Sequence, residues 1–563
     1  MEIVEMIEKS KAAEESPAPE VDVDALIVGA GFAGLLALYK LRQAGFTVLA
    51  LEASESIGGV WNWNRYPGAR CDVESMQYSY SFSEELQQTW EWSERYATQP
   101  EILRYIEHVA DRFDLNRHIQ LNTRVVSATY QAHENAWQIQ TNEGQEIRAR
   151  FCIMATGCLS AARMPEFPGK EKFKGDILHT GHWPKSGYDF TGKNVAVIGT
   201  GSSGIQAIPM IAKTANSLTV LQRTATYSVP ARNRMLDETE KRAWKENYAQ
   251  LRETARYAPS GTLYEFGERK AEETPLQDQT DEFEKRWAKG GPGFLRAFSD
   301  ISSSQIANKA AGDFIRAKIA DIVKDPEKRS LLTPATTLPV GSKRICVDTG
   351  YFETFNRENV DLIDIRNDPI KGIEENGLST KKRKLDLDCI VFATGFDVIV
   401  GSLMKIDIKG LAGRTLREKW KNGPGTYLGL MVAGFPNLFL VTGPGSPSVL
   451  TNMMVSIEQH IEWITACVES MRRQGNDYID PDEAAESKWM DDANSLAETM
   501  PFLRANSWYM ASPESGSSPR RFMLYSGGVG KYREICEQVA QQNYPGFNIG
   551  ARHVVCDVPA ELS

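Results

Sequence analysis

The sequence predicts an α/β protein in which two parallel-sheet units are joined to a helical insertion. Two segments carry most of the evidence, VDVDALIVGAGFAGLLALYKLRQAGFTVLALE from Val21 and GKNVAVIGTGSSGIQAIPMIAKTANSLTVLQR from Gly192. Each has the order strand, glycine turn, helix and strand, which is typical of a Rossmann-like dinucleotide-binding unit. Residues 237–325 are instead charged and helix-favouring, with few strand-like runs, and they predict the insertion.

Length and charge limit the class of protein. A chain of 563 residues is too long for one compact core and predicts about three to four domains. The formal net charge of -10 argues against nucleic acid and anionic membranes as partners. The longest apolar run, residues 25–39, is shorter than the ~20 residues that span a bilayer. Residues 1–20 are acidic and polar, so we expect a flexible tail, no secretory signal and a cytoplasmic protein.

The first glycine turn has the spacing of a pyrophosphate-binding loop. Gly29, Gly31 and Gly34 form G-x-G-x-x-G between an apolar strand and an apolar helix, so backbone amides and the helix N-terminus can meet a phosphate. Glu52, at the end of the next strand, can accept hydrogen bonds from ribose hydroxyls. This unit predicts a nucleotide with a free 2'-hydroxyl. For either glycine motif taken alone, tight packing is the alternative explanation.

The second glycine turn predicts a different nucleotide. Gly199, Gly201 and Gly204 repeat the spacing, but the position equivalent to the glutamate is Gln222, followed by Arg223. An arginine here can pair with a 2'-phosphate that a carboxylate would repel. The second unit should therefore prefer NADPH to NADH.

The two sites together imply electron transfer from NADPH in the second unit to FAD in the first. A thiol reductase shares this plan, but it needs a redox cysteine pair and none of the eight cysteines forms C-x-x-C. O2 is then the simplest electron acceptor. His179 and His182 are an isolated pair without further ligands, so we expect no metal.

Two longer motifs give the chain a family resemblance. Residues 58–72 read GGVWNWNRYPGARCD, and residues 173–184 read FKGDILHTGHWP, which fits F-x-G-x-x-x-H-x-x-x-W-P at every fixed position. From about Val21 to the C-terminal region the chain resembles type I Baeyer-Villiger monooxygenases, in particular the phenylacetone, cyclohexanone and steroid monooxygenase branch. The resemblance implies that a ketone substrate is converted to an ester or lactone with O2 through a flavin peroxide.

The resemblance also implies FAD and NADPH domains that are each split along the chain. We expect a tail at residues 1–20, FAD-domain parts at 21–160 and 395–563, NADPH-domain parts at 161–235 and 335–394, a helical insertion at 236–334 and a mobile active-site loop at about 501–521. The sequence predicts no particular oligomeric state.

Residues that match the family's cofactor contacts follow from the same resemblance. The expected FAD contacts are Gly29, Gly31, Gly34, Glu52, Val60, Trp61, Asn62, Trp63, Asp72 and Tyr78, with Val125 and Met453 as further cofactor contacts. The expected NADPH contacts are Thr200, Gly201, Ser202, Ser203, Gly204, Ile205, Gln206, Arg223, Thr224, Lys343, Arg344 and Trp508.

Arg344 matches the stretch that supplies the family's catalytic arginine. A guanidinium is always charged and can stabilise the oxyanion that forms when a peroxide adds to a ketone. Asp72 is expected to hold Arg344 in place, as the second catalytic residue, and Lys343 to help bind the 2'-phosphate. Without the motif, Lys343 and Arg344 would be interpreted as a solvated basic pair.

Three aromatic or imidazole side chains have a less direct interpretation. His179 and Trp183 lie just before the second unit and are expected to form a hinge that senses the nicotinamide nucleotide, with a structural histidine packed by tryptophan as the alternative. Trp508 matches a tryptophan that caps the family's active site from a mobile loop, although the residues after it depart from the family's pattern. A core tryptophan is the alternative there.

The substrate class and two competing functions complete the predictions. Positions that resemble pocket-lining ones predict an apolar cavity for aliphatic, cyclic or aryl ketones; they are Cys158, Val449, Leu450 and Met453. One competing function is a flavin monooxygenase that oxidises amine nitrogen or sulfide sulfur, against which Trp183 and Arg344 argue. The other is a non-catalytic flavoprotein that senses redox state, against which the retained Asp72 and Arg344 argue.

Overall fold

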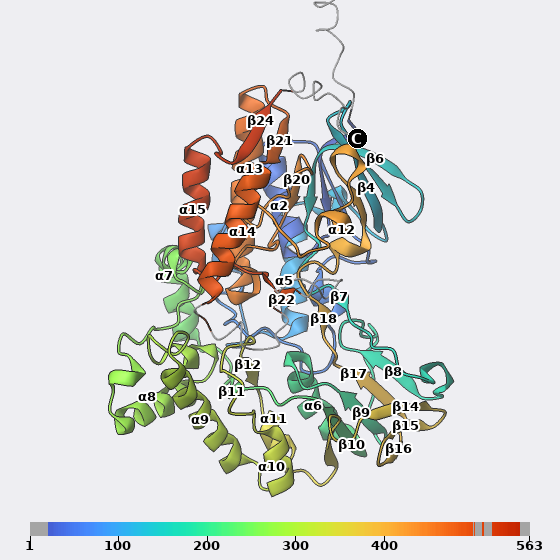
Figure 1. The fold of residues 1–563 in the computed structure, drawn as a ribbon, viewed down its shortest axis with the longest axis vertical. Coiled ribbons are helices and arrows are strands. Elements are labelled where there is room, and N and C mark those ends of the chain that lie inside the picture. The colour runs from blue at the N-terminus through green and yellow to red at the C-terminus, as the bar shows by residue number, and fades with distance from the viewer. Residues whose placement is uncertain (1–20, 499, 501–508, 512–520, 552–563) are drawn as a thin grey trace, which may run out of the picture.

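The computed structural model describes residues 21–551 apart from 499, 501–508 and 512–520. The tail predicted at residues 1–20 and most of the loop predicted at about 501–521, Trp508 included, lie outside the described residues. In the described chain, one sheet with its helices forms the upper part of the molecule and a second sheet forms the lower part, with the helical insertion beside it (Figure 1).

The first sheet has eight strands in the order β19-β4-β5-β6-β1-β2-β3, with β20 paired to β6. The bounds are β1 Val23–Val28, β2 Val48–Leu51, β3 Ile119–Gln120, β4 Val125–Gln131, β5 Ala136–Thr141, β6 Glu146–Met154, β19 Asp407–Lys409 and β20 Leu438–Leu440. Apolar β1 pairs in parallel with β2 and β6, which buries it at the centre of the sheet. Because β19 and β20 come from far along the chain, distant sequence completes this sheet.

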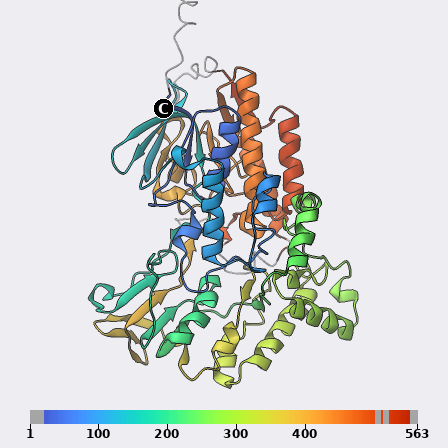
Figure 2. The ribbon, with the colours of Figure 1, turned by 180° about the vertical axis from the view of Figure 1, so that it is seen from behind.

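Helices from both ends of the chain cover the first sheet. Helix α2 (Phe32–Gln43) follows the first glycine turn and packs against α13 (Met453–Arg473). Helix α15 (Val529–Gln541) lies beside α13, and both views show the pair standing next to α2 (Figures 1 and 2). Helices α5 (Gln99–Arg112) and α14 (Glu483–Glu498) complete this layer.

The second sheet has five strands in the order β13-β10-β9-β17-β8, and every pair in it is parallel. The bounds are β8 Asp176–His179, β9 Asn194–Ile198, β10 Ser217–Gln222, β13 Val360–Asp364 and β17 Cys389–Phe392. Helix α6 (Ser202–Thr214) connects β9 to β10 after the second glycine turn. This is the predicted strand, turn, helix and strand order.

The insertion touches both units. Its helices are α7 Glu238–Tyr257, α8 Leu276–Lys289, α9 Gln305–Ile322 and α10 Pro326–Leu332. Helix α7 packs against α15 and α4 (Glu84–Thr89) of the first unit, whereas α9 and α10 pack against α11 (Tyr351–Thr354) and β13 of the second. The predicted α/β class with two Rossmann-like units and a helical insertion is confirmed.

Short elements join the two units. The strands β6 and β17 are each followed by Ala-Thr-Gly and lead to β7 (Ala161–Ala162) and β18 (Phe396–Asp397), which pair with each other between the two sheets (Figure 1). The other short elements are α3 Val60–Trp63, β11 Ser228–Pro230, β12 Cys346–Asp348, β14 Ile370–Glu374, β15 Gly377–Thr380, β16 Lys384–Asp386, α12 Leu416–Lys419, β21 Tyr478–Pro481, β22 Met510–Ala511, β23 Arg521–Phe522 and β24 Phe547–Gly550. Among the described residues, no helix is long and apolar enough to cross a membrane.

Candidate active site

The turn after β1 leaves the first turn of α2 open to an anion. Gly29 has φ of 107°, and a Cβ built there would lie 2.6 Å from the carbonyl oxygen of Ala155, so glycine is required. Helix α2 follows Gly31 and has neither a side-chain cap nor an acidic residue in its first turn. Its free N–H groups and the positive end of its dipole therefore suit a pyrophosphate.

Glu52 lies directly after β2 and is 5% exposed. Its Oε2 accepts a hydrogen bond from Ala30 N–H at 2.8 Å and its Oε1 accepts one from Ser54 N–H at 2.9 Å, which fixes the carboxylate beside the glycine turn. Burial raises the pKa of Glu52, and these backbone donors partly offset the rise. The remaining lone pairs of the Glu52 carboxylate can accept hydrogen bonds from the hydroxyl groups of a ribose.

The predicted segment from Val60 to Trp63 is helix α3, and it lies next to Glu52. Asn62 Nδ2 donates to Ser54 Oγ at 2.7 Å, and Trp61 Nε1 donates to Tyr78 Oη at 3.2 Å. These contacts gather the segment and Tyr78 on the side of the first glycine turn. Of the two further predicted contacts, Val125 is buried at the start of β4 and Met453 is the first residue of α13.

The second glycine turn opens α6 in the same way. Helix α6 follows Gly201, again with no side-chain cap and no acidic residue in its first turn. A Cβ at Gly201 would meet no atom within 4 Å, which leaves space for a phosphate. Thr200 Oγ1 donates to the carbonyl of Thr224 at 3.3 Å. The first turns of α6 carry Ser202, Ser203, Gly204, Ile205 and Gln206, and the Ile205 side chain packs in the core of this unit.

Two cations of the second unit, Arg223 after strand β10 and Lys343 before strand β12, lie near each other. Arg223 and Thr224 are exposed immediately after β10. The pKa of Lys343 is lowered, first by burial and then by the charge of Arg223, so the two cations lie close enough to repel each other. An anion between them would relieve this repulsion, as a 2'-phosphate would.

Arg344 and Asp72 form a two-pronged ion pair. Arg344 Nε donates to Asp72 Oδ2 at 2.5 Å, and its Nη2 donates to Asp72 Oδ1 at 2.8 Å. Arg344 Nη1 donates to the carbonyl of Val449 at 2.6 Å and to that of Thr451 at 3.4 Å. Two segments far apart in the sequence, one with Asp72 and one with Val449 and Thr451, therefore fix a guanidinium carried by a third.

The ion pair keeps Arg344 charged. Burial alone would lower its pKa, but the neighbouring Asp72 carboxylate outweighs burial and raises the pKa of Arg344 above its ordinary value. The side chains of Arg344 and Asp72 are still 28% and 26% exposed. The guanidinium is thus both permanently positive and reachable by a small molecule.

An apolar wall lies beside this guanidinium. Its buried members are Cys158, Ile399, Val449, Ala497, Tyr509, Phe522, Met523 and Leu524, and Leu450 and Met453 pack against them. All four predicted pocket positions therefore come together. Tyr509 is close enough to Arg344 for each group to shift the pKa of the other. The wall and the charge form one site.

His179 and Trp183 lie apart from the ion pair, in buried positions. His179 ends β8, where its Nδ1 accepts from Gly181 N–H at 2.9 Å and its Nε2 lies 3.3 Å from Thr394 Oγ1. Burial lowers the pKa of His179, which favours the neutral ring. Trp183 is 6% exposed and packs against Phe190. The predicted hinge role of these residues stays a prediction.

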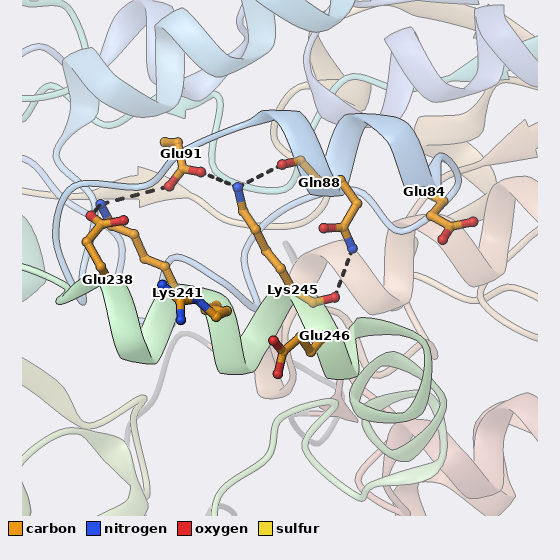
Figure 3. A pocket seen from close by; sticks show the side chains of 8 residues that line it. Glu84, Gln88, Glu91, Glu238, Lys241, Lys245 and Glu246 are labelled. Carbon is orange, nitrogen blue, oxygen red and sulfur yellow. Dashed lines mark hydrogen bonds and ion pairs between the residues drawn. The ribbon is translucent and has the colours of Figure 1, made fainter.

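A polar cavity of about 520 Å³ lies elsewhere, between α4 and α7 (Figure 3). Lys245 pairs with Glu91 and donates to the carbonyl of Gln88 at 2.7 Å, and Lys241 pairs with Glu238 at 2.8 Å. The charged groups that line this cavity are therefore largely paired with one another, and the pairs join the first unit to the insertion. Among the described residues, no group of three or more His, Cys, Asp or Glu side chains is arranged to hold a metal ion.

Comparisons with known proteins show which family this chain is similar to. Residues 26–252 match the family model described as pyridine nucleotide-disulphide oxidoreductase. A Baeyer-Villiger monooxygenase of Pseudooceanicola batsensis is 39% identical over 527 residues, which cover 93% of this chain and 95% of the relative. The chain belongs to the Baeyer-Villiger monooxygenase family. The predicted family resemblance is confirmed.

Further relatives agree over nearly the full length. The phenazine N-monooxygenase PhzNO1 of Lysobacter antibioticus is 39% identical over 531 residues, covering 93% of this chain and 96% of the relative. A solved structure of an oxidised steroid monooxygenase bound to NADP is 48% identical, with a TM-score of 0.90 and coverage of 94% and 99% of the two chains. OTEMO in complex with FAD and NADP is 38% identical, with a TM-score of 0.91 and coverage of 94% and 100%.

Several contacts of this Baeyer-Villiger site were not foreseen from the sequence. The carbonyls of Val449 and Thr451 hold Arg344, but a backbone carbonyl leaves no signature in residue type. Tyr509 faces Arg344 one position after the predicted Trp508, which itself lies outside the described residues. The side chain of Gln206 contacts the first unit instead of standing free beside its own glycine turn.

Proposed function

We propose that this protein is an FAD- and NADPH-dependent monooxygenase that uses O2 to convert ketones into esters or lactones. The observation that carries the proposal is the guanidinium of Arg344, which Asp72 and the Val449 carbonyl hold between two nucleotide-binding units and against an apolar wall. A fixed positive charge in such a place suits a reaction that develops negative charge on a carbonyl oxygen.

The residues present fit both cofactors. Uncapped α2 and the buried Glu52 carboxylate suit the pyrophosphate and ribose of FAD. Uncapped α6, with Arg223 and Lys343 nearby, suits the pyrophosphate and 2'-phosphate of NADPH. The solved OTEMO relative is a complex with the same two cofactors.

The bound flavin and nicotinamide supply the redox chemistry and the activation of O2, and the chain supplies orientation and charge. Arg344 offers its positive charge and the second N–H of Nη2, which Asp72 does not take, to the developing oxyanion of the substrate. Asp72 holds the guanidinium plane through two hydrogen bonds, so little reorganisation is needed during the reaction. The apolar wall excludes water and strengthens this electrostatic interaction.

The wall also supports a substrate class. Its side chains are aliphatic, aromatic or sulfur-containing, so it favours an apolar ketone whose carbonyl points to Arg344. Aliphatic, cyclic and aryl ketones all meet that description.

A ketone panel tests the proposal. The FAD-loaded protein is incubated with NADPH, air and each ketone, and products are analysed by mass spectrometry. We expect an ester or lactone heavier than the ketone by one oxygen atom, with label from 18O2 in the product. NADPH oxidation without an oxygenated product from any ketone in the panel would contradict the proposal. It would favour the non-catalytic flavoprotein or a different substrate class.

Oxidation of a heteroatom is the second candidate. The relative named phenazine N-monooxygenase is as similar to this chain as the relative named Baeyer-Villiger monooxygenase, at 39% identity each. Phenazines, tertiary amines and sulfides therefore belong in the same panel. N-oxide or sulfoxide formation with a higher kcat/KM than any ketone would make heteroatom oxidation the main activity.

A further inference from the structure

The side chain of Gln206 is committed to the first unit. It projects from α6, yet its Oε1 accepts from Tyr66 Oη–H at 2.8 Å and from Arg70 N–H at 3.4 Å, while its Nε2 donates to the carbonyl of Arg70 at 3.0 Å. A glutamine amide can make four hydrogen bonds, so these contacts leave little for a nucleotide.

Residues 66–70, which we call the docking loop, are pressed against α6. Gly68 has φ of 83°, and a Cβ built there would lie 2.4 Å from the carbonyl oxygen of Gln206 and 3.0 Å from Met210 Cγ. Tyr66 and Ala69 are 8% and 5% exposed and belong to the hydrophobic core of the second unit, although their sequence belongs to the first. The loop is therefore packed on the nucleotide-binding helix as well as hydrogen-bonded to it.

The docking loop leads directly to Asp72, with only Cys71 between. Its far end is fixed within the first unit, because Gln99 N–H donates to the carbonyl of Ala69 at 2.9 Å and Arg70 pairs with Glu94 at 3.2 Å. The loop and Asp72 therefore move together with the first unit, and a shift of this unit relative to α6 would displace Asp72.

Helix α6 reaches the other partner of the ion pair as well. Ser202 Oγ, in its first turn, lies 3.3 Å from the Sγ of Cys346, which is two residues beyond Arg344. The first two turns of α6 therefore contact both sides of the ion pair. Gln206 contacts the chain next to Asp72, and Ser202 contacts the chain next to Arg344.

We propose that Gln206 is a positioning residue that locks the docking loop onto the nucleotide-binding helix, so that a nucleotide seated on α6 holds Asp72 and Arg344 in register. This inference rests on the proposed function for its kinetic consequence. It assigns Gln206 to the coupling of the two units, whereas the family resemblance implied a contact with NADPH.

The first test measures the docking loop itself. Hydrogen–deuterium exchange of residues 66–72 is followed in FAD-loaded protein with and without NADP+. We expect NADP+ to slow exchange by at least about tenfold in the unaltered protein and by less than about twofold in Gln206→Leu, since local opening governs exchange. Tyr66→Phe, which removes one hydroxyl and keeps the ring packing, should give an intermediate value.

The second test separates positioning from nucleotide binding. In Gln206→Leu we expect KM for NADPH to change less than about threefold, because the nucleotide contacts remain. The kcat for ketone oxygenation should fall by about 10- to 100-fold, with more NADPH consumed without product, since a small misplacement of Arg344 is costly. Gln206→Glu keeps the acceptor for Tyr66 and loses the donor to Arg70, so it should partly restore the rate.

The polar contact in Figure 3 provides a matched control. Lys245 also joins the first unit to another part of the chain, through Glu91 and the Gln88 carbonyl, and neither of these partners lies in α6. Lys245→Met should keep the exchange protection and the rate of the unaltered protein. An equal loss in Lys245→Met and Gln206→Leu would overturn the proposal, because it would reflect general domain packing.

The outcomes also separate this inference from the proposed function. If no ketone is oxygenated, the proposed function fails, and the exchange experiment still decides the role of Gln206. Undiminished NADP+ protection of residues 66–72 in both Gln206→Leu and Tyr66→Phe would overturn the inference. A large rise in KM for NADPH with normal protection would do the same and return Gln206 to the nucleotide contacts.

Discussion

The two nucleotide-binding units share one turn and differ at the end of the strand that follows the helix. In the first unit, buried Glu52 accepts two backbone hydrogen bonds beside the glycine turn. In the second, buried Gln222 turns inward and donates to the carbonyl of Leu331 at 2.7 Å, and the next residue, Arg223, is exposed. A single strand end thus presents a carboxylate in one unit and a guanidinium in the other, and we propose that this difference selects between the two nucleotides.

The units also differ in how they are completed. The first sheet takes β19 and β20 from the C-terminal part of the chain, whereas the second sheet is built from strands between Asp176 and Phe392. The ion pair joins the two units, because Asp72 follows the docking loop of the first and Arg344 precedes β12 beside the second. Changes at the junction should therefore affect chemistry, and changes within one unit should affect its own nucleotide.

The largest effect is expected at the junction. Arg344→Ala should leave FAD bound and reducible by NADPH but lower ester formation by at least about 10²- to 10³-fold, with hydrogen peroxide released instead, because one oxyanion donor is lost. Asp72→Ala should show a milder form of the same defect. Stopped-flow flavin reduction and product analysis on one preparation separate the two steps. Full ester yield from Arg344→Ala would show that the junction does not carry the chemistry.

The next effect should be confined to the second unit. Arg223→Glu should raise KM for NADPH by about 10- to 100-fold, since a charge-assisted hydrogen bond to the 2'-phosphate is replaced by repulsion. KM for NADH, which lacks that phosphate, should change much less. Steady-state kinetics with both nucleotides measure the ratio. An unchanged preference for NADPH would contradict the assignment of the second unit.

A reciprocal exchange at the two strand ends should have a smaller effect. Glu52→Gln should weaken FAD retention by about tenfold, because a charged acceptor of the ribose hydroxyls becomes neutral. Gln222→Glu should lower the preference for NADPH over NADH by a similar factor, since it places a carboxylate near the 2'-phosphate site. Flavin release during gel filtration and the NADPH to NADH ratio measure the two changes. If each variant weakened the binding of both cofactors equally, the assignment of one cofactor to each unit would be contradicted.

The smallest effect concerns the pH dependence of stability, with one buried carboxyl near each unit. Burial raises the pKa of Asp480 in β21 to about 7 and that of Asp348 in β12 to about 6. The folded state therefore binds more protons than the unfolded state, so each group stabilises the protein most below about pH 4. That contribution falls as pH rises through the folded pKa values.

Neutral replacements test this sign. In Asp480→Asn, the apparent melting temperature should fall less steeply as pH rises to about 7. At pH 8 this variant should melt about 2–4 °C higher than the unaltered protein. Asp348→Asn should act over the narrower range up to about pH 6. Thermal scans by fluorescence at several pH values suffice. A melting temperature that drops at pH 8 in both variants would show that the charged carboxylates stabilise the fold.

The features that the sequence determined by itself are local ones. Each glycine turn, with the strand before it and the helix after it, depends on contiguous residues, because Gly29 and Gly199 permit backbone angles that other residues disfavour. The contrast between Glu52 and Arg223 can be read from the sequence, because each residue lies at a fixed distance after the glycine turn of its own unit. The motif at residues 173–184 and the one at residues 58–72 indicated the family for the same reason, since the identity of neighbouring residues carries the signal.

Only the tertiary structure decided which distant groups meet. Asp72 and Arg344 are 272 positions apart, and the carbonyl of Val449 is a further 105 positions on, so no local pattern relates their positions. The partners of Gln206 are 136 and 140 positions away, in the other unit. Such contacts depend on how whole sheets and helices pack, and a backbone carbonyl can serve as an acceptor whatever its side chain. The candidate site residues could therefore be proposed one by one from the sequence, and their arrangement required the folded chain.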